Sequence, residues 1–137
     1  MNIIEGAKKL NFPIGEYVIT GSGLLGALGL REANDLDVAI TPKLLKKLRA
    51  TGKWKEKLRH NKLKLFLESD NVDVITQLDW DKYPTTVEEA IKSATIIEGI
   101  PFLNFEQTIL FKTALGREKD FKDIELLKKY RKQNPIS

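Results

Sequence analysis

The sequence predicts an α+β fold, and three observations support this class. Short β-branched and aromatic runs typical of strands dominate the first half of the chain, whereas helical periodicity dominates the second half. The 137 residues leave room for one domain rather than two. A hydrophobic fraction of 42% with 31% charged residues is ordinary for a protein with a buried core. We therefore expect a single domain over residues 1–132 and a frayed tail over residues 133–137.

The first half is predicted to hold four strands and three helices. Asn2 caps the first helix, with Glu5 at the spacing of a capping box, and Thr41 caps the third helix. The turn-rich residues 69–71 indicate a hairpin between the two strands that flank them. We expect strands at 16–20, 36–40, 64–68 and 72–77 and helices at about 2–10, 24–30 and 41–49, with a helical crossover between the first two strands.

The second half is predicted to be mainly helical. Thr86 and Glu89 form a capping box for a helix that runs to about Ala94. A small hairpin over residues 95–103 follows, and Asn104 caps a helix over 105–115 that Gly116 closes. Apolar residues then recur at helical spacing, which predicts a last helix at about 119–132. We expect these C-terminal helices to pack on the core.

Composition excludes several classes of protein. The chain has no cysteine, which excludes disulfide scaffolds, thiolate zinc sites and cysteine nucleophiles. No apolar run approaches the roughly 18 residues that a membrane span needs. We therefore expect a cytoplasmic protein that has no membrane partner.

The charge is distributed unevenly along the sequence. The whole chain carries a formal +4, but residues 43–64 contain ten Lys or Arg and one acid, Glu56, which leaves −5 for the rest. Such asymmetry is typical of a face that meets phosphate or another polyanion. The alternative is a solvated basic helix with its loop.

A glycine-rich turn follows the first predicted strand. Gly21, Gly23 and Gly26 match the dinucleotide-binding pattern G-x-G-x-x-G, but that fold places an acid at the carboxyl end of the next strand. Here Asp35 and Asp37 lie at the beginning of that strand, so the dinucleotide-binding interpretation fails. Exposed N–H groups in such a turn can still bind an anion.

Three aspartates form the strongest chemical pattern in the chain. Asp35 and Asp37 are two residues apart on a strand, so both side chains leave one face. They repel each other unless a cation joins them, and Mg²⁺ suits oxygen ligands; the alternative is a solvated strand end. Asp73 stands in an otherwise apolar run, where burial of a carboxylate is costly. If its strand lies beside 36–40, the three carboxylates meet as two-metal phosphoryl transfer requires.

These residues resemble a known signature. Gly21-Ser22, twelve intervening residues and then Asp35-Leu36-Asp37-Val38 are similar to the nucleotidyltransferase signature of the DNA polymerase β superfamily, in which a later Asp completes the metal site. Arg31, four residues before Asp35, extends the likeness to the small antibiotic-type and toxin–antitoxin-type nucleotidyltransferases. Thr20, before the glycine, departs from the usual apolar residue of that family.

The likeness continues into the C-terminal part of the chain. Lys112, the stretch 116–120 and Asp123-Ile124 resemble the helical segment that ends the core of these enzymes. The resemblance thus covers most of the chain. It implies a small mixed sheet of the nucleotidyltransferase type, flanked by helices.

The resemblance also implies roles for single residues. Asp35 and Asp37 would be ligands of both of two Mg²⁺ ions, and Asp73 would bind the ion that activates the acceptor hydroxyl and act as its base. Gly21 and Ser22 would hold the β- and γ-phosphates of a nucleoside triphosphate through backbone N–H and hydroxyl groups.

Cations are also needed on the leaving pyrophosphate. Arg31, Lys112 and Arg117 are the candidates, although Lys112 and Arg117 would equally suit a helix C-terminus. Asp120 and Asp123 are expected only to favour the start of the last helix electrostatically.

The predicted activity is Mg²⁺-dependent transfer of a nucleoside monophosphate, AMP from ATP in the first instance, onto an acceptor hydroxyl with release of pyrophosphate. The sequence does not choose among small-molecule, protein and RNA acceptors. The alternative is a non-catalytic nucleotide-binding regulatory subunit, such as an antitoxin-like partner of a helical toxin-like protein. A third hypothesis assigns the basic segment to nucleic-acid binding.

Overall fold

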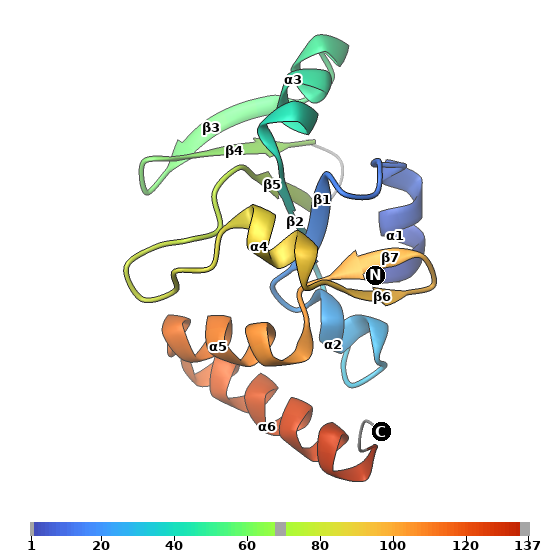
Figure 1. Ribbon diagram of the computed structural model, residues 1–137, viewed down its shortest axis with the longest axis vertical. Helices are drawn as coiled ribbons and strands as arrows, with labels where there is room; N and C mark the ends of the chain where they lie inside the picture. The colour runs from blue at the N-terminus through green and yellow to red at the C-terminus, as the bar shows by residue number, and fades with distance from the viewer. Residues whose placement is uncertain (1, 68–70, 135–137) are drawn as a thin grey trace.

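The computed structural model describes residues 2–67 and 71–134, and within them seven strands form one mixed sheet in the order β3-β4-β5-β2-β1-β7-β6 (Figure 1). The expected α+β class, with helices flanking a mixed sheet, is confirmed. The strands are β1 (Tyr17–Thr20), β2 (Leu36–Ile40), β3 (Lys55–Arg59), β4 (Lys62–Phe66), β5 (Val72–Ile75), β6 (Thr95–Ile97) and β7 (Ile100–Phe102). The helices are α1 (Ile3–Leu10), α2 (Gly23–Ala27), α3 (Pro42–Thr51), α4 (Val87–Lys92), α5 (Phe105–Leu115) and α6 (Glu118–Gln133).

The centre of the sheet is formed by β1, β2 and β5. β2 pairs antiparallel with β1 and parallel with β5. The helical crossover that we expected between the first two strands is therefore wrong, because α2 joins two antiparallel neighbours. The alternation along β2 buries Leu36 and Val38 in the main core, and Asp37 between them points to the opposite face.

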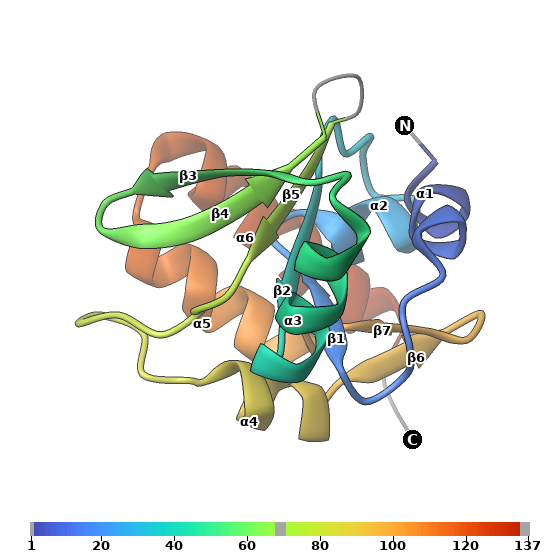
Figure 2. The same cartoon turned by 90° about the horizontal axis from the view of Figure 1, so that it is seen from above.

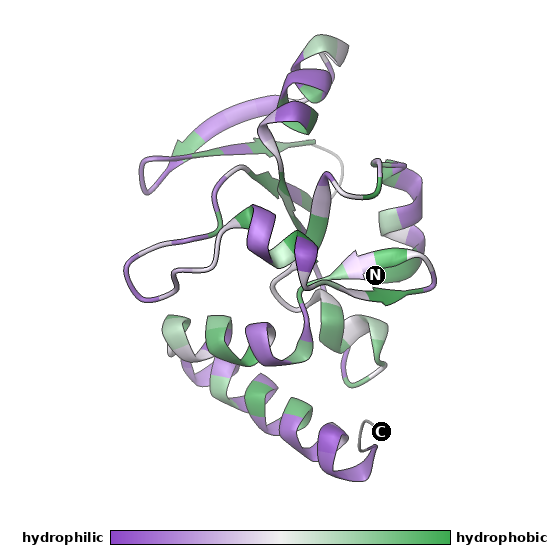
Figure 3. Ribbon diagram, viewed as in Figure 1, coloured by the Kyte–Doolittle hydropathy of each residue, from purple (hydrophilic) through white to green (hydrophobic). Residues whose placement is uncertain are grey.

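The strand β3 was not predicted, and its sequence explains why. All five residues of β3 are exposed, so the strand lacks the apolar alternation that marks a half-buried strand. It exists because it pairs antiparallel with β4 across a tight turn, in which His60 and Asn61 both adopt positive φ. Figure 3 shows that β3 is mostly hydrophilic. The basic segment therefore forms a helix and most of a hairpin, rather than a helix and a loop.

Helices cover both faces of the sheet (Figure 2). α1, α2 and α3 contribute to the main core with the inward side chains of β1 and β2. α4 packs on the opposite face, where Val18 and Ala39 belong to a second cluster with Tyr83 and Val87. α5 and α6 lie together at one end of the molecule, and Leu127 of α6 joins the main core. None of the helices in the described part of the chain has the length and apolarity needed to cross a membrane.

The predicted helix caps are confirmed in four helices. The side chains of Asn2, Thr41, Thr86 and Asn104 each accept a hydrogen bond from a backbone N–H in the first turn. Several boundaries shift by one to three residues; α2 ends at Ala27 and β4 begins at Lys62. The last helix runs one residue into the expected tail, and residues 135–137 lie outside the described residues. So do residues 68–70, which hold the end of the predicted 64–68 strand and part of its turn.

Candidate functional site

One cavity of about 860 Å³ lies where the ends of β1, β2 and β5 meet the helical pair α5–α6. β1 is antiparallel to β2, so the carboxyl end of β1 lies beside the amino ends of β2 and β5. The side chains or backbone of all the residues that we proposed from the sequence line this cavity: Gly21, Ser22, Arg31, Asp35, Asp37, Asp73, Lys112 and Arg117.

The turn after β1 packs directly against Asp37. Gly21 has a φ of +62°, which disfavours any residue with a side chain. A Cβ atom at this position would lie 2.6 Å from Oδ2 of Asp37, closer than atoms can pack. Glycine is thus required here both by backbone conformation and by the close approach of the carboxylate.

Asp37 and Asp73 occupy the same register position on adjacent parallel strands. Their side chains leave the same face of the sheet, as the sequence predicted under the condition that the two strands are neighbours. Burial, and after it the negative charges of Asp73 and Asp35, together raise the pKa of Asp37 to about 6. This carboxyl therefore lies in a concentration of negative charge that favours a cation.

Asp73 is not buried, contrary to the expectation from its apolar run. Its side chain is 34% exposed, and its Oδ2 lies 3.0 Å from Nζ of Lys64. Lys64 comes from β4, the strand on the other side of β5, and its side chain is only 11% exposed. The cost of burial is thus avoided by partial exposure and by an ion pair.

The hydroxyl of Ser22 is held by two cations. Nη2 of Arg31 donates a hydrogen bond to Oγ of Ser22 at 2.6 Å, and Nζ of Lys112 donates another at 3.1 Å. Arg31 and Lys112 also contact the same carboxylate: Asp123 accepts hydrogen bonds from Arg31 at 2.6 and 2.7 Å and from Lys112 at 2.8 Å. Two positive side chains are therefore fixed beside the Gly21-Ser22 turn.

Asp120 and Asp123 do more than the helix-start role that we expected. Asp120 does accept a hydrogen bond from the N–H of Arg117 at the start of α6, but it is fully buried and also pairs with the Arg117 guanidinium at 2.7 Å. Burial opposes ionisation of Asp123, yet hydrogen bonds from Arg31 and Lys112 outweigh it and lower the pKa below its ordinary value. The two carboxylates thus form a buried ionic network with the three predicted cations.

The alternative for Lys112, a cation at a helix C-terminus, is correct about its position in the last turn of α5 but does not account for its contacts. Its side chain is 3% exposed and points to Ser22 and Asp123 instead of to solvent. Arg117 differs, because half of its side chain is exposed toward the cavity while its guanidinium pairs with Asp120. Of the two, Arg117 can reach a bound anion most easily.

The chemistry of the carboxylates fits a hard divalent cation. Carboxylate oxygens are preferred ligands of Mg²⁺, and a cation would relieve both causes of the raised pKa of Asp37, its burial and its repulsion by Asp73 and Asp35. Among residues 2–67 and 71–134, however, no three His, Cys, Asp or Glu side chains are already gathered as a metal cluster. Asp35, Asp37 and Asp73 are the residues that would hold a metal here; to do so their side chains would have to move together, in competition with Lys64 at Asp73.

Sequence reasoning missed Lys64, and it missed the functions of Asp120 and Asp123. Lys64 alternates with the apolar Leu63 and Leu65, so its position on one face of a strand was available as a signal. Asp120 and Asp123 are three residues apart and therefore share a helix face, which is the face that packs toward α5. The sequence pattern could not show which residue of a neighbouring element each of these side chains contacts.

Comparisons with known proteins give little further information. No protein-family model matches the chain, and no curated protein matches it. Among solved structures, the chain is similar to the crystal structure of ANT(2″)-Ia in complex with adenylyl-2″-tobramycin, with a TM-score of 0.45, 16% identity and 94% of both chains covered. This is a coarse likeness of fold that assigns no activity to the chain.

Proposed function

We propose that this chain is a Mg²⁺-dependent nucleotidyltransferase that moves a nucleoside monophosphate, AMP from ATP in the first instance, onto an acceptor hydroxyl. The observation that carries the proposal is the pairing of Asp37 and Asp73 on adjacent strands, in the same cavity as a turn whose Ser22 is held by two cations. Acidic residues that bind metal and basic residues that bind pyrophosphate are the two requirements of this chemistry.

The reaction assigns a step to each side of the cavity. The acceptor oxygen forms a bond to the α-phosphorus, the bond from that phosphorus to the bridging oxygen breaks, and pyrophosphate leaves with the electron pair. The proton of the acceptor hydroxyl passes to Asp73, whose partial exposure leaves it accessible. Bound Mg²⁺ would supply charge stabilisation at the attacking and leaving oxygens, held by Asp35, Asp37 and Asp73.

The basic side of the cavity suits the leaving pyrophosphate. Lys112 and Arg31 already donate to Ser22, so phosphate oxygens placed at that hydroxyl would meet both cations. The volume of about 860 Å³ lies within the range of small-molecule sites. It is large enough for a nucleotide that spans from the carboxylates to Arg117.

A two-label experiment tests the reaction class. ATP labelled at the α-phosphate should transfer label to an acceptor, whereas ATP labelled at the γ-phosphate should release it as pyrophosphate only. Asp35→Asn and Asp37→Asn should each abolish transfer, and Asp79→Asn, which changes an acid that does not line the cavity, should retain it. Transfer of γ-label to the acceptor would instead identify a kinase and contradict the proposal.

The ion pair between Lys64 and Asp73 favours a second candidate function, a nucleotide-binding subunit without turnover. Lys64 occupies an oxygen of Asp73, the proposed base, so it competes with metal binding to that carboxylate and with proton transfer to it. Such a subunit would bind ATP with Mg²⁺ in calorimetry and release no pyrophosphate. The helical toxin-like partner that the resemblance implies for this case stays a prediction.

A further inference from the structure

The β3–β4 hairpin carries its cations on one face. Side chains alternate along a strand, so Lys55, Lys57 and Arg59 leave the same side of β3. Directly opposite partners share a face, and Lys57 pairs with Lys64 while Arg59 pairs with Lys62. Five cations therefore form a two-strand row, spaced about 7 Å apart along each strand.

This row is on the same face of the sheet as the carboxylates. Phe66, which shares the face of Lys64, is directly opposite Asp73, and Asp73 is directly opposite Asp37. Arg59 and Lys64 also line the cavity itself. The basic row thus runs without interruption from the outer edge of the sheet into the candidate site.

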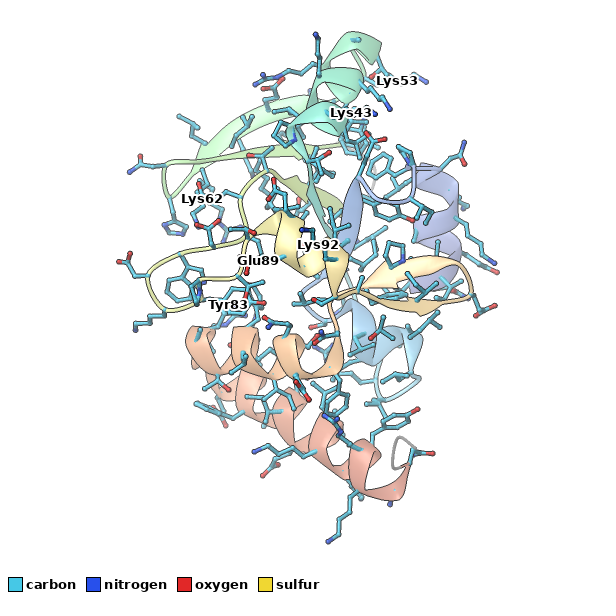
Figure 4. All side chains as sticks on the ribbon, in the orientation of Figure 1. Lys43, Lys53, Lys62, Tyr83, Glu89 and Lys92 are labelled. Atoms are coloured by element: carbon cyan, nitrogen blue, oxygen red, sulfur yellow. The ribbon has the colours of Figure 1, made fainter. Side chains whose placement is uncertain are left out.

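The opposite face of the hairpin has a different character. Glu56 points there and pairs with Arg49 of α3 at 2.8 Å, and Leu58 is 73% exposed. Figure 4 shows Lys62 below the hairpin, toward the loop that precedes α4, and Lys43 on α3 above it. On the hairpin itself, the cations are therefore confined to the site-side face, and the cations of α3 lie on the other side of the sheet.

Two cations of the row, Lys57 and Arg59, are available to a ligand. Within the described residues, neither Lys57 nor Arg59 forms an ion pair with a carboxylate. Nζ of Lys57 lies 5.0 Å from the centre of the Phe66 ring, and Lys62 donates to the backbone oxygen of Asp79. Phosphate groups can approach these side chains without breaking a salt bridge.

We infer that the acceptor is a single strand of nucleic acid whose backbone lies along this row and whose terminal sugar hydroxyl enters the cavity. The inference rests on the proposed function and assigns its acceptor class. A regular row of cations beside an aromatic ring is the combination by which proteins track a single-stranded backbone. A polycationic acceptor would be repelled by the same row, and an acidic protein would not need regular spacing.

The chemistry then fixes the product. The terminal hydroxyl oxygen of the strand forms the new bond to the α-phosphorus, pyrophosphate leaves, and the strand is longer by one nucleotide joined through a phosphodiester. The hydroxyl proton goes to Asp73, which contacts Lys64 at the inner end of the row. A strand of deoxyribonucleotides whose two ends both carry phosphate offers no terminal hydroxyl, so it should bind and remain unextended.

Binding of a fluorescent oligoribonucleotide tests the surface without catalysis. We expect the double variant Lys57→Ala/Arg59→Ala to bind about tenfold more weakly at low salt, and the slope of log affinity against log salt to fall by about 1.4, or about 0.7 for each lost phosphate contact. Both side chains are exposed, so the variant should unfold at the same temperature as the parent.

The matched control is Lys43→Ala/Lys46→Ala, which removes the same charge from exposed positions of α3 on the other side of the sheet. The control should bind as the parent does. Equal weakening by both double variants would show that only net charge matters and would overturn the inference. Competition by polyglutamate as strong as by unlabelled oligoribonucleotide would overturn it in favour of an acidic protein.

The two proposals fail in different ways. If the oligoribonucleotide binds through Lys57 and Arg59 but ATP never releases pyrophosphate in its presence, the proposed transferase function fails and the binding surface stands. If α-label reaches some other acceptor while the oligoribonucleotide does not bind, the transferase function stands and the acceptor assignment is wrong.

Discussion

At the scale of single residues, the site depends on a buried ionic network. Asp123 holds Arg31 and Lys112 in place, and both cations then reach the hydroxyl of Ser22. A buried ion pair adds little net stability, because desolvation offsets most of the attraction, but loss of one partner leaves an uncompensated charge. The network is therefore best understood as a device that fixes two cations beside the turn.

Substitution of Asp123 should destabilise the fold. Asp123→Asn leaves Lys112, among the described residues, with Asp120 at 3.8 Å as its one carboxylate partner, so we expect the free energy of unfolding to fall by about 3 kcal/mol. Chemical denaturation measures this change. Glu118→Gln removes an acid from the exposed pair with Lys122 and should leave stability unchanged. Equal stability of Asp123→Asn and the parent would show that the network is not a coupled unit.

Substitution of Asp37 should stabilise the fold, in contrast to substitution of Asp123. The Asp37 pKa of about 6 lies above the ordinary value of 3.8, so ionisation of Asp37 lowers the free energy of unfolding. The full loss is present above pH 6, and the lost stability returns as the pH falls from 6 to 3.8. In EDTA at pH 8, Asp37→Asn should therefore be more stable than the parent, by about 3 kcal/mol at most. The gain should shrink at pH 5. If Asp37→Asn melts at the same temperature as the parent at pH 8, ionised Asp37 does not destabilise the fold and this prediction is wrong.

At the scale of elements, the turn between β1 and α2 joins backbone conformation to the site. Gly21 and Gly29 both have positive φ, +62° and +72°, but only Gly21 lies against Asp37. Alanine at either position should cost about 1–2 kcal/mol of stability for the backbone alone. Gly21→Ala should in addition displace Asp37 and abolish nucleotide transfer, whereas Gly29→Ala should retain it. Loss of activity in both variants would assign the effect to stability.

The elements were predictable wherever burial imposed a pattern. The apolar alternation around Asp37 and the capping residues Asn2 and Thr86 specify their elements locally, and the structure confirms them. β3 lacks such a pattern because every residue is exposed, and its strand conformation comes from pairing with β4. Local sequence therefore predicted the buried elements and missed the one that tertiary pairing creates.

At the scale of the whole molecule, the uneven charge of the sequence becomes a spatial gradient. The basic segment forms α3 and most of the hairpin at one edge of the sheet, and three aspartates lie on the central strands. The sequence supplied the eight proposed site residues, and one cavity brings them together. Lys64 could not be assigned, because its contact with Asp73 depends on β4 lying next to β5 in the correct register.

The central claim is that the acidic and basic side chains of this cavity catalyse nucleotide transfer. The rate of pyrophosphate release tests this claim most directly. With ATP, Mg²⁺ and a single-stranded oligoribonucleotide, the parent chain should release pyrophosphate and extend the strand in equal amounts. Asp73→Asn should slow release by at least about 100-fold, because the proposed base is lost, while ATP binding persists. Pyrophosphate release by Asp73→Asn at the parental rate, or no release by the parent chain, would contradict the account.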